Sequence, residues 1–378
     1  MMNGIVNFIK KEIVFCIAFL CALVSCFFVP PSKQYVSYID WNTLFILFSL
    51  MAVVQGLSSS GLFHALGNGL CHRLHSLRAL CAALVTLCFF TSMLITNDVA
   101  LITFVPFALI LLGENASPLV VTLVVIMQTI AANTGSMLTP LGNPQNLFLF
   151  QQTGMSIKEF FLTLIPYTAL SGILLALMLF FIPGKGMVSP KESSQESHQI
   201  KNDIPYLLLF LLCLLSVLHL VPKWITAALV LVVLLVIKPS VLLKVDYMLL
   251  LTFAAFFIFT GNISHIPSVS QKLGEIVGGS EFFSAIVSSQ IISNVPATLL
   301  LYPFSTDSRE LLLGVNAGGL GTLIASLASL ISFKLYSASP KQKRKSSAVY
   351  LLLFTLANVV FLALLILLHA ALICKFSQ

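Results

Sequence analysis

The stretch from Asn115 to Ile157 contains no Asp, Glu, Lys or Arg, yet helix-breaking and amide residues interrupt it between Ala131 and Phe150. The interrupting residues are Asn133, Gly135, Pro140, Gly142, Asn143, Pro144 and Asn146. An uncharged stretch of this length is expected at membrane depth, where broken helix is tolerated only if it lines a protein-walled cavity. The pattern therefore predicts a binding site within the membrane. An ordinary polar loop is the alternative, but the same pattern returns later in the chain.

The composition places the rest of the chain in the membrane as well. Of 378 residues, 58% are hydrophobic and 9% are charged, and the mean hydropathy is +1.02. These values predict an all-α polytopic membrane protein. The Lys and Arg residues that give the net charge of +7 gather at the ends of apolar segments, so they indicate orientation rather than nucleic-acid binding. The eight Cys show no metal-ligand spacing and are expected to pack as small apolar residues.

Apolar segments divide the chain into two halves joined by a hydrophilic linker. The first half is 1–183, the cytoplasmic linker is 184–203, and the second half is 204–378. The first apolar run is expected to be a transmembrane helix rather than a signal peptide, because more spans follow. A mixed stretch over 58–75 is expected to be an interfacial helix. About ten to eleven transmembrane segments are expected, including 13–30, 41–57, 117–150, 160–183, 204–220, 224–237, 247–263, 311–336 and 348–373.

Two other apolar segments are too long for one transmembrane helix and too short for two full ones. The segment 80–112 has Thr96, Asn97 and Asp98 at its middle, and 281–305 has the run Ser-Asn-Val-Pro. Each predicts a re-entrant hairpin, in which two half-length helices meet at a polar turn. We call residues 96–98 the first tip and residues 293–295 the second tip. Pro296 has the fixed φ expected in the first turn of a helix.

The two halves repeat each other. An offset of 197 aligns the hairpins through Ser92/Ser289, Ile95/Ile292, Asn97/Asn294, Ala100/Ala297, Pro106/Pro303 and Phe107/Phe304. An offset of 183 aligns the two broken spans through Asn133/Asn316, Gly135/Gly318, Thr139/Thr322, Leu147/Leu330 and Phe150/Phe333. Asn, Gly and Pro matches at a fixed offset indicate a genuine internal repeat.

Counting basic residues gives the expected orientation. With a cytoplasmic N-terminus and an outside C-terminus, fourteen Lys and Arg fall on the cytoplasmic side and six outside, as the positive-inside rule requires. In this topology the two repeats run in opposite directions, each with one hairpin and one broken helix. Inverted repeats with broken helices at the membrane midplane are typical of secondary transporters.

Helix ends at the midplane suit small charged ligands. Helix N-termini present N–H groups to an anion, and freed carbonyl and hydroxyl oxygens suit Na⁺. The expected substrate-binding residues are Thr96, Asn97, Asp98, Asn133, Thr134, Gly135, Thr139, Asn143, Asn146, Ser293, Asn294, Asn316, Gly318, Gly319, Thr322 and Ser326. Na⁺ as a coupling ion is expected near Thr96, Asn97, Asp98, Asn133, Ser293, Asn294 and Asn316, and no other cofactor is expected.

Several of these residues also have a purely structural interpretation. Gly318 and Gly319 could simply allow close helix packing, and Asn97 could cap the helix that follows it. Asp98 is the acidic residue expected deepest in the membrane, where ionisable groups are costly and tend to be functional. It could be a proton-coupling carboxyl, a Na⁺ ligand or a helix cap.

Three runs of the sequence, at 96–107, 133–146 and 314–330, resemble the ion transporter superfamily. Its members include citrate-transporter-like permeases, divalent anion:sodium symporters, arsenite permeases and a class of Na⁺/H⁺ antiporters. The resemblance implies a homodimer that works by an elevator motion. Dicarboxylate symporters carry Ser-Asn-Thr at each tip, whereas the third residue here is Asp98 at one tip and Val295 at the other. The Asp resembles the arsenite and cation-exchanging branches, and the run Gly-Asn-Pro-Gln-Asn resembles the citrate-transporter-like branch.

The predicted function is secondary active transport of a small organic or inorganic anion, a di- or tricarboxylate or an oxyanion, coupled to Na⁺ or H⁺. The expected location is the bacterial plasma membrane. A Na⁺/H⁺ antiporter, an arsenite-type efflux permease and a membrane subunit of a larger complex are the alternatives. An enzyme is not expected, because the sequence has no His-Glu-x-x-His motif, no paired membrane aspartates and no Ser/His dyad at depth.

Overall fold

A computed structural model describes residues 12–62, 65, 74, 76–112, 116–183, 200–339 and 344–376. The regular structure of these residues consists of α-helices and short 3-10 helices, which confirms the expected all-α membrane protein. Most of the stretch 58–75 and most of the linker 184–203 lie outside the described residues.

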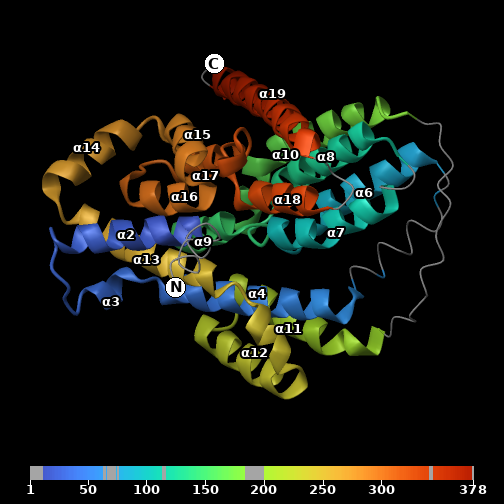
Figure 1. The fold of residues 1–378 in the computed structure, drawn as a ribbon. Coiled ribbons are helices and arrows are strands. Elements are labelled where there is room, and N and C mark those ends of the chain that lie inside the picture. Colours follow the sequence, from blue (N-terminus) through green and yellow to red (C-terminus); the bar gives the residue numbers. More distant parts are fainter. Residues whose placement is uncertain are drawn as a thin grey trace.

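In one group of helices, α11 and α12 pack on α4 at the bottom of Figure 1, and α13 packs on α2 above them. The group consists of α2 (Ile13–Cys26), α4 (Trp41–Ser60), α11 (Ile204–Val217), α12 (Lys223–Ile237) and α13 (Tyr247–Ser264). The short α3 (Tyr35–Tyr38) and the amphipathic α14 (Pro267–Val277) flank it.

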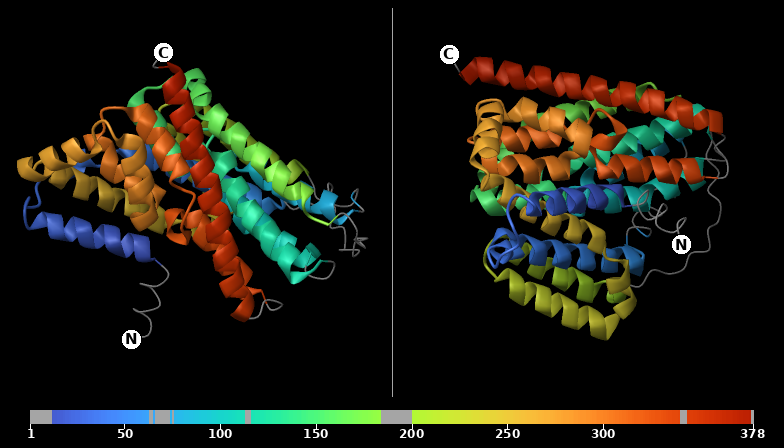
Figure 2. Two further views of the ribbon diagram at one scale, coloured as in Figure 1. Left: turned by 90° about the horizontal axis from the view of Figure 1, so that it is seen from above. Right: turned by 60° about the vertical axis from the view of Figure 1, so that its left-hand side comes forward.

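The second group contains two helix pairs, α6 with α7 and α15 with α16, which correspond to the two expected hairpins. It also contains two interrupted helices, α8 with α9 and α17 with α18. In the first half it comprises α6 (Leu77–Thr91), α7 (Asn97–Leu112), α8 (Pro118–Ser136), α9 (Pro144–Thr153) and α10 (Ile157–Phe180). In the second half it comprises α15 (Glu281–Ile292), α16 (Asn294–Leu301), α17 (Ser308–Ala317), α18 (Leu327–Ala338) and α19 (Arg344–Phe376). Figure 2 shows α19 running along the outside of this group.

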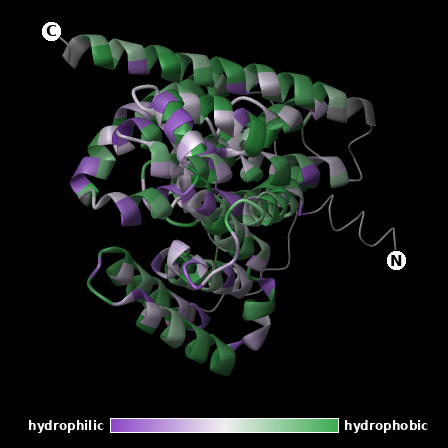
Figure 3. Ribbon diagram, turned by 90° about the vertical axis from the view of Figure 1, so that its left-hand side faces the viewer, coloured by the Kyte–Doolittle hydropathy of each residue, from purple (hydrophilic) through white to green (hydrophobic). Residues whose placement is uncertain are grey.

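Among the residues that the structure describes, five helices are long and apolar enough to cross a membrane: α4, α8, α10, α13 and α19, the last over Ala348–Cys374. Most of the helix α8 is buried inside the protein, whereas α19 is largely exposed. Figure 3 shows that α19 is mostly hydrophobic along its length, and its exposed side chains include Leu352, Leu356 and Leu367. Such exposed apolar side chains are expected in a membrane protein, because lipid rather than water surrounds them.

The helices break where the sequence carries Gly, Pro and amide residues. Ser117 caps α8 before Pro118, and the helix ends at Ser136. Asn143 then caps α9, its Oδ1 accepting the Asn146 N–H at 2.9 Å. We call residues 137–143 the first break and residues 318–326, between α17 and α18, the second break. Both breaks leave helix termini inside the protein, where caps must satisfy the freed backbone groups.

Polar contacts along α8 and α18 define how these two helices cross. The hydroxyl oxygens of Thr122 and Tyr336 lie 2.6 Å apart. The hydroxyl oxygens of Thr129 and Ser332 lie 2.5 Å apart. Because residue numbers rise along α8 as they fall along α18, the helices run antiparallel. The core of the molecule therefore joins its two halves through polar contacts as well as apolar packing.

Candidate functional site

Asn133 connects the first tip to the second break. Asn97 donates from Nδ2 to Oδ1 of Asn133 at 3.0 Å, and Ser326 donates from Oγ to the same oxygen at 3.0 Å. The Nδ2 of Asn133 donates to Ser329 Oγ at 3.2 Å. The backbone N–H of Asn97 also donates to the Gly142 carbonyl at 3.0 Å. Asn133 thus holds parts of both halves in one buried network, where each partner fixes the others.

Asn316 makes the corresponding connection from the second half to the first break. Its Nδ2 donates to Asn146 Oδ1 at 2.6 Å and to the Leu312 carbonyl at 2.8 Å. Asn143 donates from Nδ2 to Asn316 Oδ1 at 3.4 Å. All three asparagine side chains are buried, so breaking one of these bonds leaves a polar group without water to replace its partner.

The two networks use equivalent residues. At the offset of 183, Asn133 corresponds to Asn316, and the pair Asn143 and Asn146 corresponds to the pair Ser326 and Ser329. Asn133, near the end of α8, therefore bonds to Ser326 and Ser329 at the start of α18. Asn316, near the end of α17, bonds to Asn143 and Asn146 at the start of α9. A contact made twice with its two sides exchanged is the pattern that two-fold symmetry produces.

Contacts between each break and the residues just before the adjacent tip are also duplicated. Thr139 donates from Oγ1 to the Met93 carbonyl at 2.5 Å, and Thr322 donates from Oγ1 to the Gln290 carbonyl at 3.4 Å. The offsets of 183 and 197 relate these two contacts. Gln290 additionally accepts the Thr322 N–H at 2.8 Å. The hydroxyls expected to bind substrate are therefore used to attach each break to the adjacent helix pair.

Two of the expected glycines lie where helices approach most closely. A Cβ on Gly135 would lie 2.7 Å from Ser92 Oγ and nearer still to the Phe89 carbonyl oxygen. A Cβ on Gly318 would lie 2.8 Å from Ser289 Oγ. Real side chains do not tolerate such distances, so both positions require glycine for packing. That either glycine also contacts substrate stays a prediction.

The remaining expected residues have a helix-internal contact, an unusual backbone conformation or a place at a tip. Thr134 donates its hydroxyl to the Ile130 carbonyl of its own helix, and Ser293 has a φ of +74°, in the left-handed region. A Cβ on Gly319 would lie 2.8 Å from Asn294 Nδ2. Asp98 lies in the first turn of α7, and its N–H is bonded to Asn97 Oδ1 at 2.9 Å.

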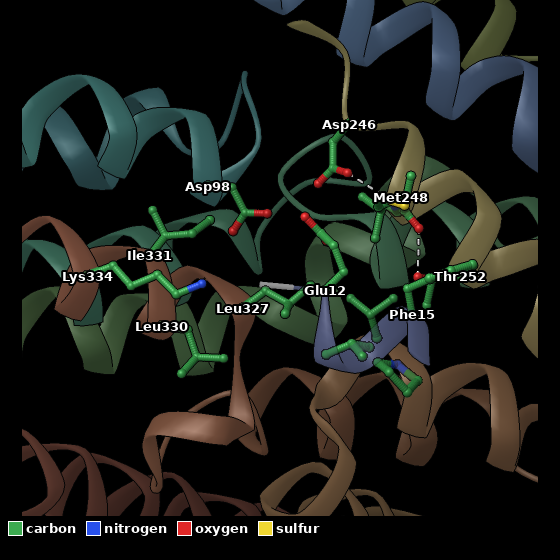
Figure 4. Close-up of a pocket in the computed structure, with 14 residues that line it drawn as sticks. Glu12, Phe15, Asp98, Asp246, Met248, Thr252, Leu327, Leu330, Ile331 and Lys334 are labelled. Carbon is green, nitrogen blue, oxygen red and sulfur yellow. Dashed lines mark hydrogen bonds between the residues drawn. The ribbon is translucent and has the colours of Figure 1, made fainter. Parts of the chain in front are cut away.

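Two cavities adjoin the first tip, with volumes of about 220 and 140 Å³. Asp98, Asp246 and Leu249 line both of them. Figure 4 shows Asp98 and Asp246 facing the larger cavity, into which Lys334 reaches from α18. Lys244 and Thr96 line the smaller cavity. The first tip therefore borders a space whose walls carry both acidic and basic side chains.

A third, much smaller chamber of about 10 Å³ lies between the two tips. Asn97 and Asp98 of the first tip and Asn294 of the second tip line it, together with Gln145 and Ser326. This chamber brings five polar residues from both halves around one point. The oxygen atoms of these residues are the kind of ligand that a hard cation such as Na⁺ takes. Among the described residues, no group of three His, Cys, Asp or Glu that could hold a metal ion occurs.

Sequence reasoning did not single out Gln145 or Gln290, and it did not predict that Asn133 pairs with Ser329. Gln145 lies inside the Gly-Asn-Pro-Gln-Asn run between two residues that were selected, so its place in a break was the available signal. Gln290 offers no such signal, because it lies within an apolar helix.

Comparison with known proteins identifies a family of transporters. The family described as "Citrate transporter" matches residues 5–327. The inner membrane protein YbiR of Escherichia coli is 33% identical over 82% of this chain and 84% of its own length. The uncharacterized transporter MJ0456 of Methanocaldococcus jannaschii is 33% identical over 81% of this chain and 84% of its own length. The rice silicon efflux transporter LSI3 is 32% identical over only 38% of this chain and 29% of its own length.

The helical fold and these matches define a polytopic membrane transporter rather than an enzyme. The chain belongs to the citrate transporter family.

Proposed function

We propose that this chain is a secondary active transporter that moves a small organic or inorganic anion, a di- or tricarboxylate or an oxyanion, coupled to Na⁺ or H⁺. The observation that carries the proposal is the convergence of both tips, the first turn of α9 and the end of the second break on one small chamber. Helix N-termini at such a point offer N–H groups to an anion, and carboxylate, amide and hydroxyl oxygens offer ligands to a cation.

Inverted repeats are part of the proposal. The exchanged contacts of Asn133 and Asn316 and the antiparallel crossing of α8 and α18 support it. In an inverted pair of repeats, one sequence motif can line the site from both sides of the membrane. The proposed motion is an elevator, in which the group containing the tips and breaks moves against the group containing α2, α4, α11, α12 and α13.

Asp98 is the proposed coupling group. It lines all three cavities, so a proton or cation held there lies beside both the chamber and the route to it. A bound cation would offset the repulsion between this carboxylate and an anionic substrate. The Na⁺/H⁺ antiporter and the arsenite-type efflux permease are the competing functions, and Asp98 is the observation that favours each of them.

The proposed assembly is a homodimer in a bacterial inner membrane, with a cytoplasmic N-terminus and an outside C-terminus. The name of the Escherichia coli relative supports the membrane, and the distribution of Lys and Arg supports the orientation. Lys244 and Lys334, which fall on the cytoplasmic side in this topology, line the two larger cavities. The larger cavities are accordingly proposed to open toward the cytoplasm.

The test is a screen of thermal stability with citrate, succinate, sulfate, phosphate and arsenite, each in Na⁺ or choline. A ligand that binds only the folded protein raises its apparent stability by mass action. An anion-dependent shift that is larger in Na⁺, or larger at lower pH, is expected. Shifts with Na⁺ and pH alone that disappear in Asp98→Asn would contradict anion transport and favour the antiporter.

A further inference from the structure

The two groups of helices are bonded to each other through the end of α9. Gln152 donates from Nε2 to Oδ2 of Asp40, the residue that caps α4. Its neighbour Gln151 donates from Nε2 to the Val217 carbonyl at the end of α11, at 3.2 Å. Asp40 and Gln152 are both half-buried. We call the bond between Asp40 and Gln152 the first latch, because it joins the first group, which contains α4, to the second group, which contains α9.

The second half carries the residue that matches Asp40. Asp246 follows an aliphatic residue and precedes an aromatic one, as Asp40 does, at an offset of 206. Asp246 caps α13 by accepting the Leu249 N–H at 3.0 Å, and Asp40 caps α4 in the same way. The backbone φ is −78° at both aspartates. Asp246 therefore occupies the same place at the start of α13 that Asp40 occupies at the start of α4.

A hydrogen-bond donor lies in the matching place of the second group. At the offset of 183 that aligns the broken spans, Lys334 of α18 corresponds to Gln151 of α9, and Leu335 corresponds to Gln152. Leu335 has no polar atom in its side chain, but the adjacent Lys334 carries an ammonium group that donates hydrogen bonds. The second half thus has an acid and a donor where the first half has its latch.

In this structure the second pair is open. Asp246 and Lys334 are exposed, and both line the larger cavity of about 220 Å³. Figure 4 shows them on different sides of that cavity. Between these two described residues no hydrogen bond or ion pair forms. Glu12 and Asp98 line the cavity as well, so Lys334 faces three carboxyl groups across it.

The closed pair and the open pair lie at opposite ends of the first group. Lys238, which caps the end of α12, donates from Nζ to the Ser59 carbonyl at the end of α4, at 3.3 Å. The 3-10 helix Pro239–Lys244, which leads to Asp246, also packs on α4. Asp40 instead lies at the start of α4, whose 20 residues span about 30 Å. The interface between the two groups is therefore bonded at one end and open at the other.

We propose that Asp246 and Lys334 form a second latch, an ion pair that closes its end of the interface when the first latch opens, so that the two latches alternate during transport. This inference rests on the proposed function and names residues that control its motion. In a pair of inverted repeats, each half can take the arrangement that the other half shows. A partly exposed ion pair is only weakly stabilising, so the second latch can break again in every cycle.

The first test detects the closed second latch in the unmodified, full-length protein. A carbodiimide joins a carboxylate to an amine that touches it, forming an amide with loss of water. Proteoliposomes are treated while solute and gradient are supplied, and linked peptides are identified by mass spectrometry. A link between Asp246 and Lys334 is expected. Links from Lys334 to Asp98 or Glu12 alone, or no link from Lys334 at all, would overturn the inference.

The second test measures gradient-driven uptake. Lys334→Glu is expected to lower uptake at least roughly tenfold, because like charges facing each other oppose closure. Adding Asp246→Asn is expected to restore most of that uptake, since the amide can donate to the new carboxylate and still cap α13. Lys334→Gln, which copies the chemistry of the first latch, is expected to lower uptake far less than Lys334→Glu does.

Lys238→Glu is the matched control, because it makes the same charge change at the same end of the protein and Lys238 lines none of the three cavities. Its uptake is expected to stay near that of the unmodified protein, with or without Asp246→Asn. Thermal unfolding in detergent shows that each variant is folded.

Two uptake results would overturn the second latch. One is full uptake by Lys334→Glu. The other is a Lys334→Glu defect that Asp246→Asn does not relieve, although the double variant unfolds at the temperature of the unmodified protein. Accumulation of a solute by an unmodified protein that shows neither the link nor the relief leaves the proposed transport function intact and rejects the latches. Absence of accumulation under every gradient contradicts the proposed function itself.

Discussion

Asn133 and Asn316 are 183 residues apart, and the hydrogen-bond partners of one lie 183 residues from the partners of the other. Asn133 contacts Ser326 and Ser329, while Asn316 contacts Asn143 and Asn146. The breaks are thereby joined across the molecule rather than within each half. A change in one asparagine is expected to disturb the site from both sides.

Replacing either asparagine by alanine tests this connection. Asn133→Ala removes three side-chain hydrogen bonds and leaves Asn97 Nδ2 without its partner, so a loss of roughly 1–3 kcal/mol in stability is expected. Asn316→Ala is expected to cost a similar amount and to abolish transport as well. Thr163→Val is the control, because Thr163 bonds only within α10. Thermal unfolding in detergent and uptake in vesicles measure the two effects, and wild-type uptake by both alanine variants would contradict the account.

The close approach of α8 to the end of α6 is tested at Gly135. Gly135→Ala places a methyl group against Ser92 and Phe89, and an overpacking cost of about 1–3 kcal/mol or more is expected. Gly172→Ala is a matched control, since its Cβ would lie an ordinary 3.5 Å from the ring of the same Phe89. Gly318→Ala should reproduce the Gly135→Ala effect against Ser289. Melting temperatures that fall equally for Gly135→Ala and Gly172→Ala would argue against the packing role.

Asp98→Asn tests the coupling group. The amide keeps the size of the side chain but removes the charge, so uptake is expected to lose its dependence on Na⁺ or pH. Asp40→Asn provides the control, because Asp40 caps α4 through the N–H groups of Asn42 and Thr43 and lines none of the three cavities. Uptake rates are compared across Na⁺ concentrations and pH values. An unchanged ion dependence in Asp98→Asn would assign coupling to another group.

Much of the helical framework was predictable, because apolar length and helix breakers act locally. The run around Asn97 begins a helix, Pro296 falls in the first turn of α16, and the break after Ser136 coincides with the Gly and Pro residues that follow it. Capping by Asn143 is likewise a local event. The ends of helices differ from the expected spans by a few residues, since hydropathy does not mark where a cap forms.

The pairing of side chains in the site was not predictable in the same way. That Asn133 bonds Ser326, or that Gln145 keeps an unpartnered oxygen, depends on how distant helices cross. Composition also could not separate Gly135, which is required for packing, from Asn97, which lines the chamber. Local sequence identifies polar breaks at membrane depth, while tertiary contacts decide which of their residues remain available to a ligand.

The most direct test of the central claim is gradient-driven uptake by the purified protein in proteoliposomes. Radiolabelled citrate, phosphate, sulfate and arsenite are supplied separately, with either an inward Na⁺ gradient, an inward proton gradient or neither. The account predicts accumulation of one of these solutes above its equilibrium level under one gradient, and loss of that accumulation in both Asn133→Ala and Asn316→Ala. Equilibration without accumulation under every gradient, or accumulation that survives in both variants, would contradict it.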